Sequence, residues 1–423
     1  MDRRIYDAYV SLLREELTMA TGCTEPIAIA YAGAKVREVL GRVPDHCTVY
    51  CSGNIIKNVM AVTVPNSGGM RGIDTAALLG MIGGDASVEL DVLHAVTEEN
   101  ILEMLRLKEA GVCSCELVEE VANLYIRIEA EAGEDSALVE IREYHANITR
   151  IEKNGVRIQS GSEETEKAVL EDRSFLKIRD ILQFAEELDV EDVREILENQ
   201  IRCNSAISEE GLRHPWGAQV GRTIADCGIE GSLIDLARSK AAAGSDARMN
   251  GCPMPVVINS GSGNQGITLT MPLVVYAEAY SVEHDRLLRA LALANLIALH
   301  EKRFIGSLSA YCGAVSAATA SACGVAYMFG AGYDVICGVL TNSLNTTGGM
   351  VCDGAKSSCA AKIATAVGMA LLAMEMSLRD RVFREGEGLV EADVEQTIRS
   401  IGRMGRVGMK ETDVEILNIM LGN

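Results

Sequence analysis

Hydrophobic and polar positions alternate along this chain with two periods, one helical and one strand-like. At the N-terminus, apolar residues recur at helical spacing and predict two helices, Tyr6–Met19 and Glu25–Leu40, separated by a short link. Pro26 suits the first turn of the second helix, because the N–H that proline lacks is not needed there. Thr24 is then the expected N-cap residue, and Cys23 should lie at the positive end of this helix.

Strand-like segments follow the two helices. Cys47–Gly53 and Val59–Pro65 are extended runs that predict two strands. Beyond a helical block over Asp74–Ala110, further runs between residues 115 and 158 alternate apolar and polar positions. Such alternation is typical of antiparallel sheets with one solvated face, so residues 1–160 predict an N-terminal α+β domain with a mostly antiparallel sheet.

A helical period dominates the rest of the chain, from about Ala168 to about Met420. The polar and charged residues 160–166 predict a linker or domain boundary in front of it. We therefore expect an α+β fold in which residues 161–423 form a mainly α-helical catalytic domain. Glycine-rich breaks interrupt the helical period at the three places where we expect chemistry, Met249–Gly266, Tyr311–Ala314 and Asn345–Lys362.

The charge balance argues against two classes of partner. Lys and Arg total 39 against 60 Asp and Glu, a formal net charge of -21 that would repel a phosphate backbone and an anionic membrane surface. We therefore expect neither nucleic acid nor membrane as a partner. Phe304–Tyr333 is uncharged and long enough to cross a bilayer, but its Ala, Gly, Ser and Cys content favours buried helices instead.

The N-terminus and the cysteines indicate a cytoplasmic protein. The first residues interleave charged and apolar side chains and lack the apolar stretch of a signal peptide. In a reducing compartment, the 13 cysteines would serve as core residues, metal ligands or catalysts more often than as disulfides. Apolar residues reach 48%, a surplus that is compatible with a homodimer.

Three cysteines carry the strongest chemical signal. Cys352 and Cys359 lie seven residues apart, where a glycine turn enters a helix, and Lys356 adds positive charge. Glycine-rich loops and helix N-termini supply N–H donors to thiolate ligands, although two buried core cysteines would show the same spacing. Cys312, beside Gly313, has a matching context. Three thiolates on a [4Fe–4S] cluster would leave one iron open to substrate.

The other cysteines carry less signal. Cys113 and Cys115 form a C-x-C pair that would suit a soft metal, but a pair without partners is more often structural. No zinc pattern of C-x-x-C with H-x-x-H occurs. We expect most of the remaining cysteines to be packing residues, namely Cys47, Cys51, Cys203, Cys227, Cys252, Cys323 and Cys337.

Two glycine-rich loops are candidates for binding an anion such as an amino-acid carboxylate. The loop Asn259–Gly266 follows an apolar extended run and offers N–H groups together with Ser260, Ser262 and Asn264. Its spacing matches neither a P-loop nor a dinucleotide fingerprint, which argues against a nucleotide.

The second loop, Asn66–Gly72, presents Asn66 and Arg71 for the same carboxylate, and an ordinary turn is the alternative.

His300 and Lys302 close the apolar helix Leu287–Leu299. Cations at a helix C-terminus are common for purely electrostatic reasons, but these two side chains could also orient a substrate or move protons. Lys57 and Lys356 could be proposed as Schiff-base lysines for pyridoxal phosphate, the usual cofactor for amino-acid elimination. A lysine in a loop is too weak a signal for that assignment.

Four motifs in order give the chain a resemblance to a known family. Thr21–Pro26, Ser52-Gly53-Asn54, Asn259–Gly266 and Gly349–Lys356 closely resemble the L-cysteine desulfidase family, which is related to the α-chain of bacterial iron–sulfur L-serine dehydratases. The resemblance covers nearly the whole chain. It implies a [4Fe–4S] enzyme that cleaves L-cysteine to pyruvate, ammonia and sulfide without pyridoxal phosphate, and it adds Ser52 and Asn54 to the candidate substrate-binding residues.

The resemblance also bears on individual cysteines. Cys23, Cys312 and Cys352 match the family's functional cysteines, and Cys359 matches the last cluster ligand of the dehydratases at a shorter spacing from Cys352. We assign Cys312, Cys352 and Cys359 to iron. Cys23 is then a free thiolate of lowered pKa that takes the substrate α-proton. In the alternative assignment Cys23 is a ligand and Cys359 a packing residue.

Two rival functions remain open. L-serine dehydration would use the same iron on a hydroxyl group instead of a thiol. A non-catalytic iron–sulfur or zinc protein, such as a sulfur carrier or redox sensor, would need a fourth protein ligand.

Overall fold

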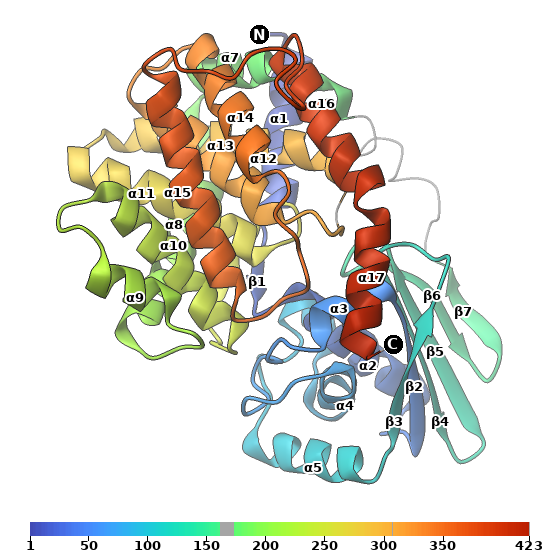
Figure 1. Ribbon diagram of the computed structural model, residues 1–423. Helices are drawn as coiled ribbons and strands as arrows, with labels where there is room; N and C mark the ends of the chain where they lie inside the picture. The colour runs from blue at the N-terminus through green and yellow to red at the C-terminus, as the bar shows by residue number, and fades with distance from the viewer. Residues whose placement is uncertain (161–172, 307, 423) are drawn as a thin grey trace.

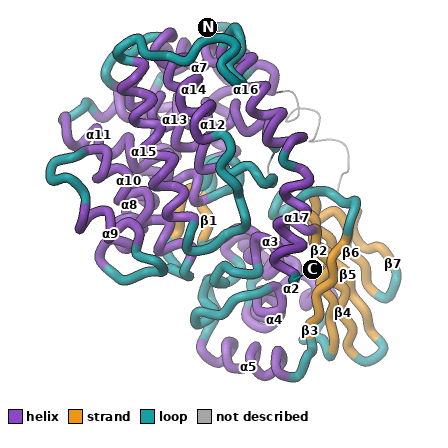
Figure 2. The backbone as a smooth tube through the Cα atoms, viewed as in Figure 1, coloured by secondary structure: helices purple, strands orange, loops and turns teal. Residues whose placement is uncertain are grey.

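The computed structural model describes residues 1–160, 173–306 and 308–422, and it is an α+β structure with two parts (Figure 1). The predicted linker lies outside the described residues from residue 161 onward. One part, the α/β half, holds a six-stranded sheet with its helices. The other part, the helical half, holds most of the helices (Figure 2).

The α/β half is built from residues 24–160. Its helices are α2 (Thr24–Leu40), α3 (Gly53–Val59), α4 (Ile73–Gly83) and α5 (Glu98–Glu109). Its strands are β2 (His46–Ser52), β3 (Cys113–Val118), β4 (Tyr125–Ala132), β5 (Asp135–Arg142), β6 (Ile148–Lys153) and β7 (Val156–Ser160).

The sheet has the order β3-β2-β4-β5-β6-β7 and is antiparallel except for the β2–β3 pair, which is parallel. The mostly antiparallel sheet expected from the alternating pattern is therefore confirmed. α2 packs on this sheet and on α4, and the two helices approach closely at Gly80, where a Cβ would lie 2.1 Å from the Ala30 oxygen. Small residues in both helices permit this approach.

The predicted strand over Val59–Pro65 is wrong. Only Val59 of this run belongs to a helix, as the last residue of α3, and residues 60–65 form bends and the start of a turn in which Thr63 makes a single bridge with Arg71. Val62 and Val64 are buried all the same. An apolar run indicates burial, but it does not by itself supply the neighbouring strand that a sheet needs.

The helical half contains α1 (Arg3–Glu16), β1 (Met19–Thr21) and most of the chain after residue 173. Its later elements are α7 (Ile178–Glu187), α8 (Arg194–Arg213), α9 (Val220–Cys227), α10 (Leu233–Met249), β8 (Pro255–Val257), α11 (Gly263–Tyr280), α12 (His284–Ile305), α13 (Gly313–Met328), α14 (Tyr333–Thr347), α15 (Cys359–Ser377) and α16 (Val394–Arg403). The last helix, α17 (Lys410–Leu421), extends from this half to the α/β half (Figure 1).

α13 lies at the centre of the helical half, and nearly all of its residues are buried. It packs against α11, α12, α14 and α15, so the uncharged stretch forms a buried helix as expected. Within the described ranges, α15 alone has the length and composition of a membrane span, and half of its apolar window is buried inside the protein. Its packing on α10, α13 and α14 accounts for that apolar character.

Two hydrophobic cores follow this division, and the chain passes between them more than once. One core joins residues 6–20 to residues 176–409, and the other joins residues 27–151 to Leu417. In the first, Tyr9 of α1 packs edge-on against Phe184 of α7, and β1 pairs antiparallel with β8. Both ends of the chain therefore help to hold the two halves together.

Candidate active site

Four cysteines from distant parts of the chain line one small cavity of about 110 Å³, called here the cysteine cavity. Cys23 is the N-cap residue of α2, Cys312 is the N-cap residue of α13, and Cys359 is the first residue of α15. Cys352 lies in the loop before α15. Helix N-termini present free N–H groups and a positive dipole end, which is the environment that thiolates favour.

A short backbone bridge holds Cys312 beside Cys352. The Cys312 N–H donates to the Met350 oxygen at 3.0 Å, and the Cys352 N–H donates to the Ala310 oxygen at 2.7 Å. A hydrogen bond with Cys312 lowers the pKa of Cys352 to about 6, against the effect of burial, and the charge of Lys57 contributes. The same hydrogen bond raises the pKa of Cys312. Cys352 is therefore the more acidic thiol of this pair.

Cys359 lines the same cavity from the start of α15. Its N–H donates to the Lys356 oxygen at 2.9 Å, and burial raises the pKa of its thiol, as does the nearby Cys352. Lys356 was expected to add positive charge, but it pairs with Asp353 at 2.6 Å, and Lys362 pairs with the same carboxylate. Much of the lysine charge at this loop is thus neutralised locally.

The prediction of a lowered pKa for Cys23 is wrong. Burial raises the pKa of this thiol well above its ordinary value, and the carboxylate of Glu25 raises it further. The Cys23 Sγ donates a hydrogen bond to Glu25 Oε2 at 2.9 Å. Cys23 rather than Thr24 occupies the N-cap position. A full negative charge in hydrogen-bond contact outweighs the partial charge of the helix end.

Glu25 is the buried acid of the site, and the sequence analysis did not select it. Its carboxylate accepts hydrogen bonds from Cys23, from Thr24 Oγ1 at 3.2 Å and from Asn58 Nδ2 at 3.1 Å. Burial by itself would raise the pKa of Glu25, but the charge of His145 and these contacts lower it below its ordinary value. Glu25 is therefore an ionised acceptor beside a protonated thiol.

Lys302 and His300 differ in their surroundings although both belong to α12. Lys302 is buried and lines the cysteine cavity. Burial lowers the pKa of Lys302, while Cys352 and Cys312 oppose the shift. His300 lines neither this cavity nor the wider one described next. Its Nε2 lies 2.7 Å from Glu395 Oε2 of α16.

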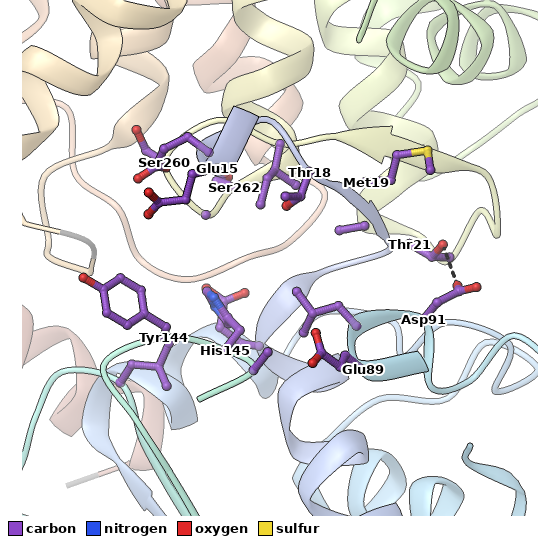
Figure 3. Close-up of a pocket in the computed structure, with 18 of the residues that line it drawn as sticks. Glu15, Thr18, Met19, Thr21, Glu89, Asp91, Tyr144, His145, Ser260 and Ser262 are labelled. Atoms are coloured by element: carbon purple, nitrogen blue, oxygen red, sulfur yellow. Dashed lines mark hydrogen bonds between the residues drawn. The ribbon is translucent and has the colours of Figure 1, made fainter. Parts of the chain in front are cut away.

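A wide cavity of about 1130 Å³ lies where the two halves meet and adjoins the cysteine cavity. Figure 3 shows Ser260 and Ser262 on the helical side, facing Tyr144, His145 and Glu89 on the α/β side. The two cavities share four lining residues, Glu25, Ser262, Lys302 and Leu308. A small molecule in the wide cavity would therefore lie next to the cysteine cavity.

Four of the seven predicted substrate-binding residues line a cavity, and three do not. Asn66, Ser260 and Ser262 line the wide cavity, and Ser262 and Asn264 line the cysteine cavity. Ser52, Asn54 and Arg71 line neither cavity. The Ser52 Oγ donates to the Asn123 oxygen at 2.6 Å, and Arg71 is exposed.

Arg248, at the end of α10, is a site residue that the sequence did not reveal. Only 2% of it is exposed, its Nε has no hydrogen-bond partner among the described atoms, and it lines the cysteine cavity. Asn264 Oδ1 and Gln265 Oε1 are buried in the same cavity and also lack partners. Because unpaired buried polar atoms are costly, these groups make the cysteine cavity a candidate binding site for a polar molecule.

The donor set fits an iron–sulfur cluster better than a single metal ion. Across the described ranges, no three His, Cys, Asp or Glu side chains are arranged to hold one ion. Each thiolate of a cuboidal cluster binds a different iron, so its ligands stand farther apart than those of a mononuclear site. Cys312, Cys352 and Cys359 line one buried cavity, with Cys312 and Cys359 at helix N-termini and Cys352 in the loop before α15. Backbone N–H donors are therefore close to the sulfurs.

Sequence comparisons give this geometry a context. Residues 87–418 match the family model described as serine dehydratase alpha chain. A UPF0597 protein of Lachnoclostridium phytofermentans is 46% identical over 99% of this chain and 100% of the relative. Similar proteins of the same name occur in Finegoldia magna, 47% identical over 98% and 99% of the two chains, and in Treponema denticola, 42% identical over 100% and 99%.

Proposed function

Because this chain belongs to the serine dehydratase alpha chain family, we propose that it is an iron–sulfur lyase that cleaves L-cysteine to pyruvate, ammonia and sulfide. The proposal rests on one observation. Four cysteines, an ionised glutamate, a buried lysine and a buried arginine line a single small cavity that adjoins a wide one. This set of groups can hold a metal cluster, bind an amino acid and move a proton.

Cys312, Cys352 and Cys359 are the proposed cluster ligands. A [4Fe–4S] cluster with three protein ligands supplies an iron with an open position that acts as a Lewis acid on a leaving group. The hydrogen bond with Cys312 lowers the pKa of Cys352, which favours the thiolate form that iron binds. Cys23 is less suited to ligation, since its proton is held by the neighbouring Glu25 carboxylate.

Arg248 is the proposed partner of the substrate carboxylate. Its guanidinium is buried in the cysteine cavity and has a free Nε donor, and arginine binds carboxylates through its planar fork. Asn264 and Gln265 offer unpaired oxygens to the substrate ammonium. Arg248 thereby takes the role that the sequence analysis gave to Arg71, which lies outside both cavities.

Cys23 and Glu25 form the proposed proton-transfer pair. In the proposed relay, the Cys23 Sγ proton passes to Glu25 Oε2 over the existing 2.9 Å hydrogen bond as Cys23 Sγ receives the substrate α-proton, so that no free Cys23 thiolate has to form against the raised pKa of this thiol. Buried Lys302 can donate a proton to the departing sulfide. The aminoacrylate that leaves tautomerises to an imine and is hydrolysed by water to pyruvate and ammonia.

The choice of L-cysteine over L-serine rests on the motif resemblance, whereas the matched family model carries the name of a serine dehydratase. L-serine dehydration is therefore the second candidate. Pyruvate should be measured from each amino acid under strict exclusion of oxygen, with sulfide counted in parallel. A higher kcat/KM for L-cysteine supports the proposal, and a far higher value for L-serine overturns the substrate assignment.

Separate Cys→Ala variants test the ligand assignment. Cys312→Ala, Cys352→Ala and Cys359→Ala should each lose the visible absorption of the cluster, whereas Cys23→Ala should keep it and lose turnover. Cys227→Ala is the matched control, because Cys227 is exposed on α9 and should affect neither. A Cys23→Ala protein without cluster absorption, alongside a Cys359→Ala protein that keeps it, would reverse the assignment.

The proposal also covers the location, the oligomeric state and the partners of the enzyme. We propose a cytoplasmic homodimer whose substrate is a small amino acid, without nucleic acid or membrane partners. Sedimentation of the loaded protein measures the oligomeric state. A non-catalytic role would be indicated if L-cysteine left the cluster spectrum unchanged and no pyruvate formed.

A further inference from the structure

A second group of thiols lies in the sheet, away from both cavities. Cys47 and Cys51 belong to β2, and Cys113 and Cys115 belong to β3, its parallel neighbour. We call these four residues the β2–β3 thiol cluster. None of them lines the cysteine cavity or the wide cavity. The sequence analysis treated all four as structural, because the C-x-C pair had no evident partners.

The strand register brings these thiols together. Cys47 lies directly opposite Cys113, and Cys115 lies opposite Val49, one step along the same face. The Cys47 N–H donates to the Val112 oxygen at 2.8 Å, which ties the two strands at this point. Side chains two residues apart on a strand share a face, so all four thiols project from one side of the sheet.

The four thiols differ in access to solvent. Cys47 and Cys51 are fully buried, whereas Cys113 is partly exposed and Cys115 is exposed, because β3 is the edge strand. Cys113 is hydrogen-bonded to Cys47, and Cys115 is hydrogen-bonded to Cys51. The bond with Cys51 lowers the pKa of Cys115, so Cys115 is the reactive thiol that a small molecule meets first.

We propose that the β2–β3 thiol cluster is a thiol–disulfide exchange site for small disulfides, in which Cys115 reacts first and Cys47 and Cys113 end as a disulfide. Adjacent strands lie about 4.8 Å apart, so the Cα atoms of directly opposed residues fall within the range that a disulfide requires. The diagonal pair Cys51 and Cys115 is separated by roughly 8 Å by the same spacing, which is too far.

The exchange is balanced in three steps. The Cys115 thiolate attacks a small disulfide RSSR, forms the mixed disulfide Cys115–S–S–R and releases RS⁻. Cys113 loses its proton and attacks the Cys115 sulfur, which displaces the second RS⁻. Cys47 then loses its proton and attacks the Cys113 sulfur, which restores the Cys115 thiolate. In total RSSR is reduced to two RSH, and Cys47 and Cys113 are oxidised to one disulfide.

L-Cystine is one small disulfide of this class. Its reduction would release two molecules of L-cysteine for each Cys47–Cys113 disulfide formed, and L-cysteine is the substrate of the elimination; this link alone rests on the proposed function. The exchange itself depends on no cluster and no turnover. A failure of the exchange therefore leaves the proposed function untouched, and a failure of the elimination leaves the exchange untouched.

The test is a peptide map of the reduced, cluster-loaded protein after treatment with L-cystine or with oxidised glutathione in the absence of air. The expected result is a peptide pair joined through Cys47 and Cys113, two hydrogen atoms lighter than the free peptides and separated again by dithiothreitol. Cys227, exposed on α9, is the internal control and should carry only the mixed disulfide.

Two variants make the outcome decisive. Cys115→Ser should slow formation of the joined peptides at least tenfold without abolishing it. Cys113→Ser, at a partly exposed edge position, should instead leave Cys115 as a lasting mixed disulfide. The proposal is overturned if the wild-type protein retains mixed disulfides in β3 while Cys47 stays free, if Cys51 is joined to Cys115, or if β3 does not react at all.

Discussion

Glu25 is buried, and its carboxylate accepts hydrogen bonds from Cys23, Thr24 and Asn58. A buried carboxylate with this many donors stays ionised, because the hydrogen bonds and the nearby charge of His145 offset the loss of water. The same negative charge keeps the Cys23 proton in place. Cys23 and Glu25 thus form an acid–base pair, and we expect proton transfer through it only when a substrate is in the cavity.

Glu25→Gln should therefore lower kcat by about 100-fold or more, the range typical of a lost general base, while the cluster absorption stays intact. Glutamine keeps the size of the side chain but cannot take the Cys23 proton. Glu89→Gln, which changes an acid of the wide cavity, is the matched control and should leave kcat nearly unchanged. Equal losses in the two variants would contradict the role of Glu25.

Asp246 of α10 offers a prediction on pH and stability. Burial raises the pKa of Asp246 from 3.8 to about 6, although its carboxylate accepts a hydrogen bond from the Gly221 N–H at 2.9 Å. A raised folded-state pKa means that the protonated form stabilises the fold. This contribution is fully present below the unfolded-state pKa and is lost as pH rises through about 6.

Asp246→Asn should remove that pH dependence. Relative to the variant, the wild-type chain should lose stability between pH values of about 4 and 6 and show a constant difference above them. Urea unfolding of the cluster-free chain at several pH values measures this difference. Asp226→Asn, at an exposed position of α9, should give a curve parallel to that of the wild type. A constant difference for Asp246→Asn over the whole range would refute the argument.

At the scale of elements, the site is assembled from loops that lead into helices. Cys23, Cys312 and Cys359 each stand at the first turn of a helix, and Cys352 is held by the bridge between Tyr311 and Val351. The loop that carries Cys352 then turns at Gly354, whose φ is +91°. A Cβ at Gly354 would lie 2.2 Å from the Lys57 oxygen of α3. This position therefore requires glycine both for its backbone conformation and for space.

Gly354→Ala should reduce the iron content per chain by more than half, because the loop can no longer lie against α3 with Cys352 and Cys359 in position. Gly349→Ala is the matched control from the same loop, since its Cβ would meet nothing within 4 Å. Iron and acid-labile sulfide are counted after anaerobic reconstitution. Full cluster loading of Gly354→Ala would show that the loop tolerates a different path.

At the scale of the whole molecule, α17 links the two halves next to the site. Leu417 of α17 belongs to the core of the α/β half and packs against Gly53, where a Cβ would lie 2.6 Å from Leu417 Cδ2. Asp413 of the same helix pairs with Lys57, which is 1% exposed and whose charge helps to lower the pKa of Cys352. The end of the chain thus neutralises a lysine buried beside the cysteine loop.

Asp413→Asn should lower the free energy of unfolding by about 3 kcal/mol or more, because it leaves the Lys57 charge buried without a partner. Urea unfolding measures the change, and Glu411→Gln, at an exposed position of α17, is the control and should change it little. The double variant Lys57→Met, Asp413→Leu should recover much of the loss, since an apolar pair often replaces a buried ion pair without cost. A fully stable Asp413→Asn protein would argue against the role of this pair.

The sequence predicted the fold class and the buried character of α13. It also selected Cys312, Cys352 and Cys359 as candidate ligands, and these three residues line one cavity. These follow from periodicity and from residue types at helix starts, which are local properties. The strand expected over Val59–Pro65 was wrong, because a local apolar run predicts burial but cannot show whether another strand lies beside it.

What the linear sequence by itself determined was therefore local, namely where helices begin, which segments are apolar and which residue types could bind iron. Only the tertiary structure decided that Glu25 raises the pKa of Cys23, that Arg248 faces the cysteines while Arg71 does not, and that four thiols meet between β2 and β3. The physical reason is that pKa shifts, cavities and thiol pairs depend on neighbours in space, and packing brings those neighbours from distant parts of the chain.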